Sequence, residues 1–121
     1  MTFFERIFVL HAHPTKLILE MLGVLWVVYF LWHQNWVWAL VSGIGLPIFS
    51  TVLVWGKDEE RFAQTTLGKF MLTHVHPLNA LLHIIGAIPL VYGLWIHSAL
   101  YIFLGISGFV VGHLWGWERL R

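Results

Sequence analysis

The fold is decided by residues 74–86, which read His-Val-His-Pro-Leu-Asn-Ala-Leu-Leu-His-Ile-Ile-Gly. Proline has no N–H to leave unpaired at the first position of a helix, so Pro77 predicts a helix start. Counted from that start, Asn79 and His83 fall on one helical face at i and i+4. Polar and metal-ligating side chains therefore gather at one end of a largely apolar helix, with His76 beside the same face.

The composition indicates an integral membrane protein. Of the 121 residues, 59% are hydrophobic and 11% charged, and the mean hydropathy is +0.77, more apolar than a soluble domain of this size. A helix needs about 20 mostly apolar residues to cross ~30 Å of hydrocarbon. Four stretches meet or nearly meet this requirement: Pro14–Trp32, Trp36–Trp55, Leu78–Ile96 and Ala99–Trp117. A net charge of +1 gives no reason to expect nucleic acid as a partner.

The two halves of the chain match each other when one is shifted by 63 residues. The matched pairs are His11 and His74, His13 and His76, Pro14 and Pro77, Gly23 and Gly86, Tyr29 and Tyr92, Trp32 and Trp95, and Gly45 and Gly108. Such a fixed period predicts a duplicated unit. We expect one all-α membrane domain, residues 1–121, made of repeats 1–61 and 62–121. Each repeat has a short interfacial helix and a helical hairpin, and an even number of spans per copy makes the repeats parallel.

The positive charges predict the orientation. All seven Lys and Arg residues lie near the termini or in the linker between the second and third spans, whereas the tips around Gln34 and Ser98 carry none. By the positive-inside rule both termini face the cytoplasm, and the protein is multi-pass. A cleaved signal peptide is the alternative at the N-terminus, but Glu20 interrupts the apolar run, so we treat the first span as retained.

The ionisable residues inside the expected spans are the best candidates for function, because such residues are costly in hydrocarbon. They are Glu20, His83 and His113. Two histidines and one carboxylate suit non-haem Fe(II), and imidazole also suits zinc. The alternative for Glu20 is an i, i+4 pair with Lys16 at the interface. For His83 it is a hydrogen bond to a neighbouring helix.

The second half also resembles a known family. Residues 76–89 and the later segment Gly112-His-Leu-Trp-Gly-Trp-Glu118 resemble the small membrane family that includes an iron-dependent 2-hydroxy fatty acid dioxygenase of fatty-acid α-oxidation. The resemblance covers residues 74–118. It implies functional roles for His76, Asn79, His83, His113 and, more weakly, Glu118. Two features depart from the family pattern: its glutamate usually stands one position nearer the histidine, and its Arg-Arg-Pro-Ala-type tail is replaced by a chain ending at Arg121.

These observations predict a membrane-embedded Fe(II) dioxygenase that acts on 2-hydroxy fatty acids or a similar lipid acyl chain. His83 and His113 would bind the metal with His76 or Glu20 as a third ligand, and Asn79 would orient a ligand or the substrate. The alternative is a non-catalytic accessory subunit, packed as a homo-oligomer or in a larger membrane complex. Such a subunit could bind haem or a pigment through its histidines.

Overall fold

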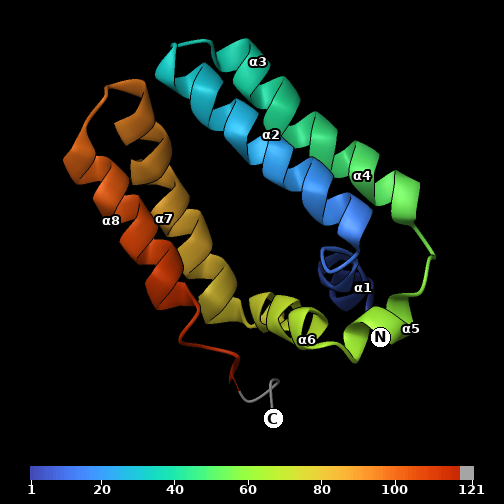
Figure 1. Ribbon diagram of the computed structural model, residues 1–121. Coiled ribbons are helices and arrows are strands. Elements are labelled where there is room, and N and C mark those ends of the chain that lie inside the picture. Colours follow the sequence, from blue (N-terminus) through green and yellow to red (C-terminus); the bar gives the residue numbers. More distant parts are fainter. Residues whose placement is uncertain (118–121) are drawn as a thin grey trace.

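Residues 1–117 are described by a computed structural model in which every regular element is a helix. Four long apolar segments form two antiparallel hairpins (Figure 1). Helix α2 (Pro14–Trp32) pairs with the segment Trp36–Val54, and α7 (Pro77–Trp95) pairs with α8 (Ala99–Gly112). The all-α fold is therefore confirmed. The expected helix starts at Pro14 and Pro77 are confirmed as well, each with a histidine as N-cap.

The segment Trp36–Val54 is helical throughout but changes its winding. It consists of α3 (Trp36–Leu40), a π-helical turn η1 (Val41–Gly45) and α4 (Leu46–Val54). Pro47 explains the wider turn, because proline lacks a donor and its ring crowds the carbonyl one turn earlier. The second span thus ends at Val54, one residue before the expected Trp55.

Short helices form a layer at one end of the hairpins. Thr2 and Glu5 make a reciprocal capping box that starts the first of them, and Thr65 caps the third. An ion pair of 2.8 Å between Arg6 Nε and Glu59 Oε2 ties the first short helix to the second. These elements are α1 (Phe3–Leu10), α5 (Glu59–Ala63), α6 (Thr66–Leu72) and the 3-10 turn η2 (Thr73–Val75).

Three helices are long and apolar enough to cross a membrane, namely α2, Trp36–Val54 and α7. The fourth apolar helix is shorter than expected. Helix α8 ends at Gly112 rather than Trp117, because the chain turns at His113 and adopts a left-handed conformation at Gly116, with φ of 86°. Fourteen residues rise about 21 Å, less than the ~30 Å hydrocarbon core.

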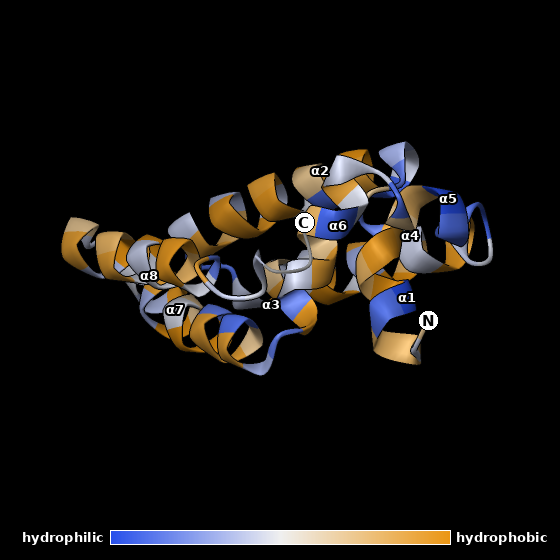
Figure 2. Ribbon diagram, turned by 90° about the horizontal axis from the view of Figure 1, so that it is seen from below, coloured by the Kyte–Doolittle hydropathy of each residue, from blue (hydrophilic) through white to orange (hydrophobic). Residues whose placement is uncertain are grey.

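Most apolar side chains of the long helices face outward. Few of them are buried. Leu31, Ala39 and Leu94 form a cluster near the hairpin tips, and Leu10 and Val54 are buried at the opposite end, beside the short helices. Viewed from below, hydrophobic residues cover the long helices, while the hydrophilic ones gather on α1, α5 and α6 (Figure 2). Water would not tolerate so much contiguous apolar surface, whereas lipid does.

The two hairpin tips are joined by a reciprocal pair of hydrogen bonds. Gln34 Nε2 donates to the carbonyl of Trp95 at 3.1 Å, and His97 Nε2 donates to the carbonyl of Trp32 at 2.6 Å. Gln34 and His97 also share a left-handed backbone, with φ of 54° and 56°. Figure 1 shows that α2 and α7 both run from the layer of short helices toward these tips.

Candidate metal centre

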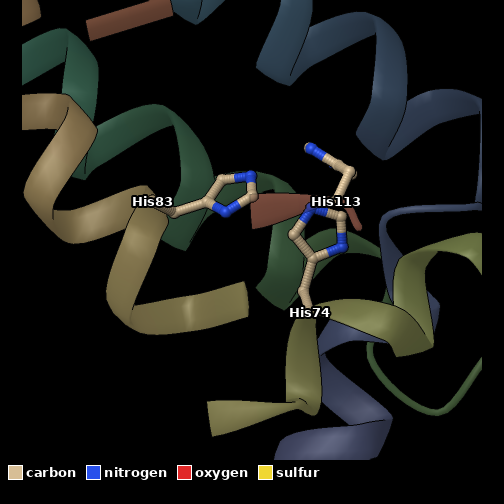
Figure 3. Close-up of side chains that lie close together, drawn as sticks. All are labelled: His74, His83 and His113. Atoms are coloured by element: carbon tan, nitrogen blue, oxygen red, sulfur yellow. The ribbon is translucent and has the colours of Figure 1, made fainter. Parts of the chain in front are cut away.

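Three histidines from three elements converge beside the short-helix layer. His74 belongs to η2, His83 to the second turn of α7, and His113 follows the last residue of α8. One ligand nitrogen from each lies within 4.8 Å of the other two. The ring centroids are 4.6 to 4.9 Å apart, and the three imidazoles face a common space (Figure 3). We call this group the His74 cluster.

Each imidazole in the His74 cluster is oriented by a main-chain carbonyl. The Nδ1 atoms donate to the carbonyls of Met71 at 3.1 Å, Asn79 at 2.8 Å and Phe109 at 2.7 Å. A carbonyl only accepts, so each neutral ring carries its proton on Nδ1 and an exposed lone pair on Nε2. This is the arrangement of metal-binding histidines, whose second nitrogen is fixed by a carbonyl or carboxylate.

Glycines bring the helices that carry the cluster close together. A Cβ atom on Gly86 would lie 2.8 Å from the carbonyl oxygen of Gly105, so α7 and α8 approach too closely for side chains between them. Near the cluster, a Cβ atom on Gly112 would lie 2.9 Å from His83 Nδ1. The glycines of α8 thus set the space in which His83 and His113 meet.

Burial keeps the His74 imidazole uncharged. Loss of solvent lowers the pKa of His74 from 6.5 to about 4, against the effect of its hydrogen bond to Met71, and His113, His83 and His11 lower it further. Metal ions bind the neutral imidazole. At a pH near 7, the Nε2 lone pair of His74 is therefore free to bind a metal ion.

Asn79 lies one turn before His83 and connects the cluster to the chain beyond α8. Its side chain is fully buried, and Nδ2 donates to the carbonyl of Trp115 at 3.3 Å and to Thr73 Oγ1 at 3.4 Å. Its Oδ1 atom is buried with no hydrogen-bond donor among residues 1–117. A buried acceptor without a partner is costly, so this atom is available to a bound molecule or water.

The structure brings together only part of the expected ligand set. His83 and His113 meet as expected, but the third member is His74 rather than His76 or Glu20. His76 is the N-cap of α7 and its Nδ1 accepts a hydrogen bond from the Leu78 N–H at 3.3 Å. Glu20 pairs with Lys16 in the first hairpin. Glu118, the weakest of the expected residues, lies outside the described residues.

A divalent cation fits the His74 cluster better than haem does. Two nitrogens bound to a tetrahedral ion at about 2.1 Å are about 3.4 Å apart. The observed spacing of up to 4.8 Å is wider than this, so the rings would have to turn toward a bound ion. A porphyrin between two axial histidines needs a gap that rings 4.6 Å apart do not leave.

An apolar groove of about 920 Å³ runs between the hairpins. One wall is the face of α7 from Ile84, the residue after His83, to Trp95, and this wall is about 16 Å long. The opposite wall comes from α2 and α3–η1, including Val27, Leu31 and Gly43. An extended apolar chain could lie here with one end near the level of His83.

Comparison with known proteins found no match: no protein-family model, no curated protein and no solved structure matches the chain.

Proposed function

We propose that the protein is a membrane-embedded non-haem iron oxygenase that oxidises a lipid acyl chain, with 2-hydroxy fatty acids as the preferred substrate class. The proposal rests above all on the three Nε2 lone pairs of the His74 cluster, each oriented by a carbonyl-bound Nδ1. Three neutral imidazoles suit first-row divalent cations. Iron held by three protein ligands would keep positions open for dioxygen and substrate, and would supply the redox chemistry.

The residues around the cluster would bind and orient the substrate. The unpartnered Oδ1 atom of Asn79 would accept a hydrogen bond from a hydroxyl group held near the cluster. The apolar groove that begins at Ile84 would take the acyl chain. Because the cluster lies beside the layer of short amphipathic helices, the polar head would stay near water while the chain stays in hydrocarbon.

We further propose that the hairpins are parallel repeats with both termini in the cytoplasm. The reciprocal bonds of Gln34 to Trp95 and of His97 to Trp32 support the repeat. The two donor residues, Gln34 and His97, are 63 positions apart, and so are the two acceptor residues, Trp32 and Trp95. A mutual contact of this type is what a twofold relation produces. The basic residues, none of which occupies a tip, support the orientation.

A zinc-dependent hydrolase is the second candidate. No carboxylate belongs to the His74 cluster within residues 1–117, and three histidines with one open position also form catalytic zinc sites. In that case the centre would activate water rather than dioxygen.

Metal analysis followed by an oxygen assay tests the proposal. Protein purified in detergent without added metal should contain about one metal ion per chain. After anaerobic loading with Fe(II), it should consume oxygen when a 2-hydroxy fatty acid is supplied. His83→Ala should abolish both metal binding and turnover, while His97→Ala, at the opposite end of the helices, should change neither.

Three results would defeat the oxygenase. Zinc bound without oxygen uptake would favour the hydrolase. A haem spectrum would mean that the imidazoles can separate far enough to hold a porphyrin between them. Absence of metal, together with copurifying membrane chains, would leave an accessory subunit as the better explanation.

A further inference from the structure

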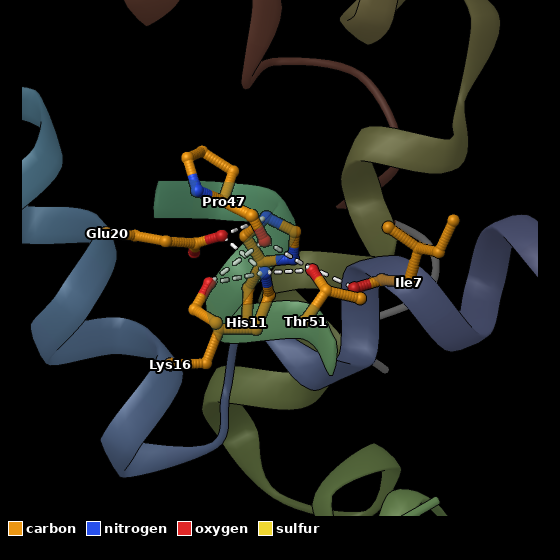
Figure 4. A network of polar contacts seen from close by, with 7 residues as sticks. Ile7, His11, Lys16, Glu20, Pro47 and Thr51 are labelled. Atoms are coloured by element: carbon orange, nitrogen blue, oxygen red, sulfur yellow. Dashed lines mark hydrogen bonds and ion pairs between the residues drawn. The ribbon is translucent and has the colours of Figure 1, made fainter. Parts of the chain in front are cut away.

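A second polar cluster, built around a lysine, lies inside the first hairpin. The Lys16 side chain is 1% exposed, and its Nζ atom donates to Glu20 Oε1, to Thr51 Oγ1 at 2.7 Å and to Ser50 Oγ at 3.3 Å. Glu20 Oε1 also lies 3.3 Å from His11 Nε2. Figure 4 shows Lys16, Glu20, His11 and Thr51 drawn together. We call this group the Lys16 cluster.

The ammonium group of Lys16 is fully coordinated by the protein. An ammonium has three N–H donors, and the Lys16 cluster supplies three acceptors in Glu20, Ser50 and Thr51. The two hydroxyls are themselves fixed, since both donate to the carbonyl of Pro47. A buried charge without such partners would be strongly destabilising. The site is therefore built around a cation, and the chain itself provides that cation.

The Lys16 cluster stands at the positions that match the His74 cluster. With a shift of 63 residues, His11 corresponds to His74, Glu20 to His83 and Ser50 to His113. His11 is also oriented in the same way, because its Nδ1 donates to the carbonyl of Ile7 at 2.9 Å. Lys16 itself takes the position of Asn79, whose side chain carries no charge.

We propose that the Lys16 cluster is a second cation site in which the lysine ammonium takes the place of a divalent metal ion. While Lys16 is present, its positive charge excludes metal from the first hairpin. Removing that charge leaves a carboxylate, two hydroxyls and the His11 imidazole around the vacated space. Oxygen ligands with one imidazole suit Mn²⁺ or Fe²⁺. The 3.3 Å between Glu20 Oε1 and His11 Nε2 is close to the separation of two ligands on one ion.

The Lys16 cluster shares no residue with the His74 cluster, so the two sites can be tested independently. The experiment therefore uses chains in which His83→Ala has removed a ligand of the other centre. Lys16→Ala/His83→Ala should bind one Mn²⁺ ion per chain, counted by electron paramagnetic resonance and metal analysis. His83→Ala alone should bind none. The matched control, Lys16→Ala/Glu20→Gln/His83→Ala, lacks the carboxylate and should bind none either.

Thermal unfolding provides a second measurement. Lys16→Ala/His83→Ala should melt at a lower temperature than His83→Ala, because Glu20 loses its buried partner, and Mn²⁺ should restore much of that loss. The Glu20→Gln control should show no shift with Mn²⁺. A helical Lys16→Ala/His83→Ala chain that ignores millimolar Mn²⁺ would overturn the proposal. So would a chain that fails to fold with and without the ion, or a His83→Ala protein that already binds Mn²⁺ through Glu20.

Discussion

Gly112 lies directly against the imidazole of His83, so that a Cβ atom added to the glycine would stand 2.9 Å from Nδ1 and 3.3 Å from the carbonyl of Asn79. That carbonyl is the acceptor for the same Nδ1. Because Gly112 has only a hydrogen at this point, the His83 ring keeps its position and the hydrogen bond that orients it. The second turn of α7 and the end of α8 therefore pack in close contact at this point.

Gly112→Ala should therefore disturb the His74 cluster without removing a ligand. The added methyl group would push the His83 ring away, and such overpacking costs about 1–3 kcal/mol. Metal affinity should fall by about 10- to 100-fold, the effect expected when the support of a ligand is lost. Gly45→Ala is the matched control, because a Cβ atom there meets no other atom within 4 Å. Equal affinities in isothermal titration calorimetry for both variants would contradict this role of Gly112.

His74→Ala and His76→Ala separate the ligand set of the structure from the set expected from sequence. His74 is a member of the cluster, so its loss should remove stoichiometric metal. His76 only caps α7, and its loss should lower the free energy of unfolding by about 0.5–2 kcal/mol while metal is kept. Metal content and a denaturation curve measure the two effects. If His76→Ala loses the metal and His74→Ala keeps it, then His76 is the third ligand, as expected from the sequence.

The main elements of the fold could be predicted because their signals are local. Pro14 and Pro77 fix helix starts, and apolar runs of about 20 residues identify α2, Trp36–Val54 and α7. The length of α8 could not be predicted in the same way. Its apolar run continues to Trp117, and the turn that ends it depends on Gly116, where a Cβ atom would lie 2.8 Å from the Thr73 carbonyl. That contact joins residues far apart in sequence.

From the sequence, the only site residues that could be predicted were those that place an ionisable group inside an apolar span. His83 and His113 were expected because ionisable groups inside spans are costly. Whether His74 or His76 joins them depends on the 3-10 turn η2, which a sequence pattern does not specify. The pairing of Glu20 with Lys16 was recognised as the alternative to metal binding, but Lys16 is buried rather than at a hydrated interface, and Glu20 is only partly exposed. The two hydroxyls that make this burial tolerable come from α4, thirty or more residues away.

The lowered pKa of His74 predicts how acid affects the metal-free protein. In the folded chain the imidazole takes up a proton only near pH 4, whereas in the unfolded chain it does so near 6.5. The unfolded state thus binds more protons between these values, so His74 makes stability fall as the pH drops from about 6.5 to about 4. Nuclear magnetic resonance of ¹⁵N-labelled histidine should show His74 neutral at pH 5.5, with its proton on Nδ1. A charged His74 at that pH would disprove the assignment.

Cysteine labelling tests the proposed orientation. Gln34 and Ser98 lie at the two tips, and this chain has no cysteine of its own. Gln34→Cys and Ser98→Cys should react with a membrane-impermeant maleimide added to intact cells. Lys57→Cys, in the linker between the hairpins, should react only after the membrane is opened. The reverse pattern would mean that the termini face outward, and unequal labelling of the tips would mean that the hairpins are not parallel.

Asn79 should support the metal centre through its amide nitrogen, which holds the Trp115 carbonyl and thereby the chain that follows His113. Asn79→Ala removes this bond, so we expect a loss of about 1–3 kcal/mol in stability and weaker metal binding, yet a milder effect than that of His83→Ala. Asn79→Asp keeps the size of the side chain but turns a carboxylate oxygen toward that carbonyl and loses the donor. If the donor matters, the aspartate variant should be less stable than the alanine variant and bind metal less tightly at pH 7. Calorimetry and metal titration on both variants measure this order. An aspartate variant that matches the wild type would show that shape alone places Asn79 there, and the amide would then have no part in holding His113.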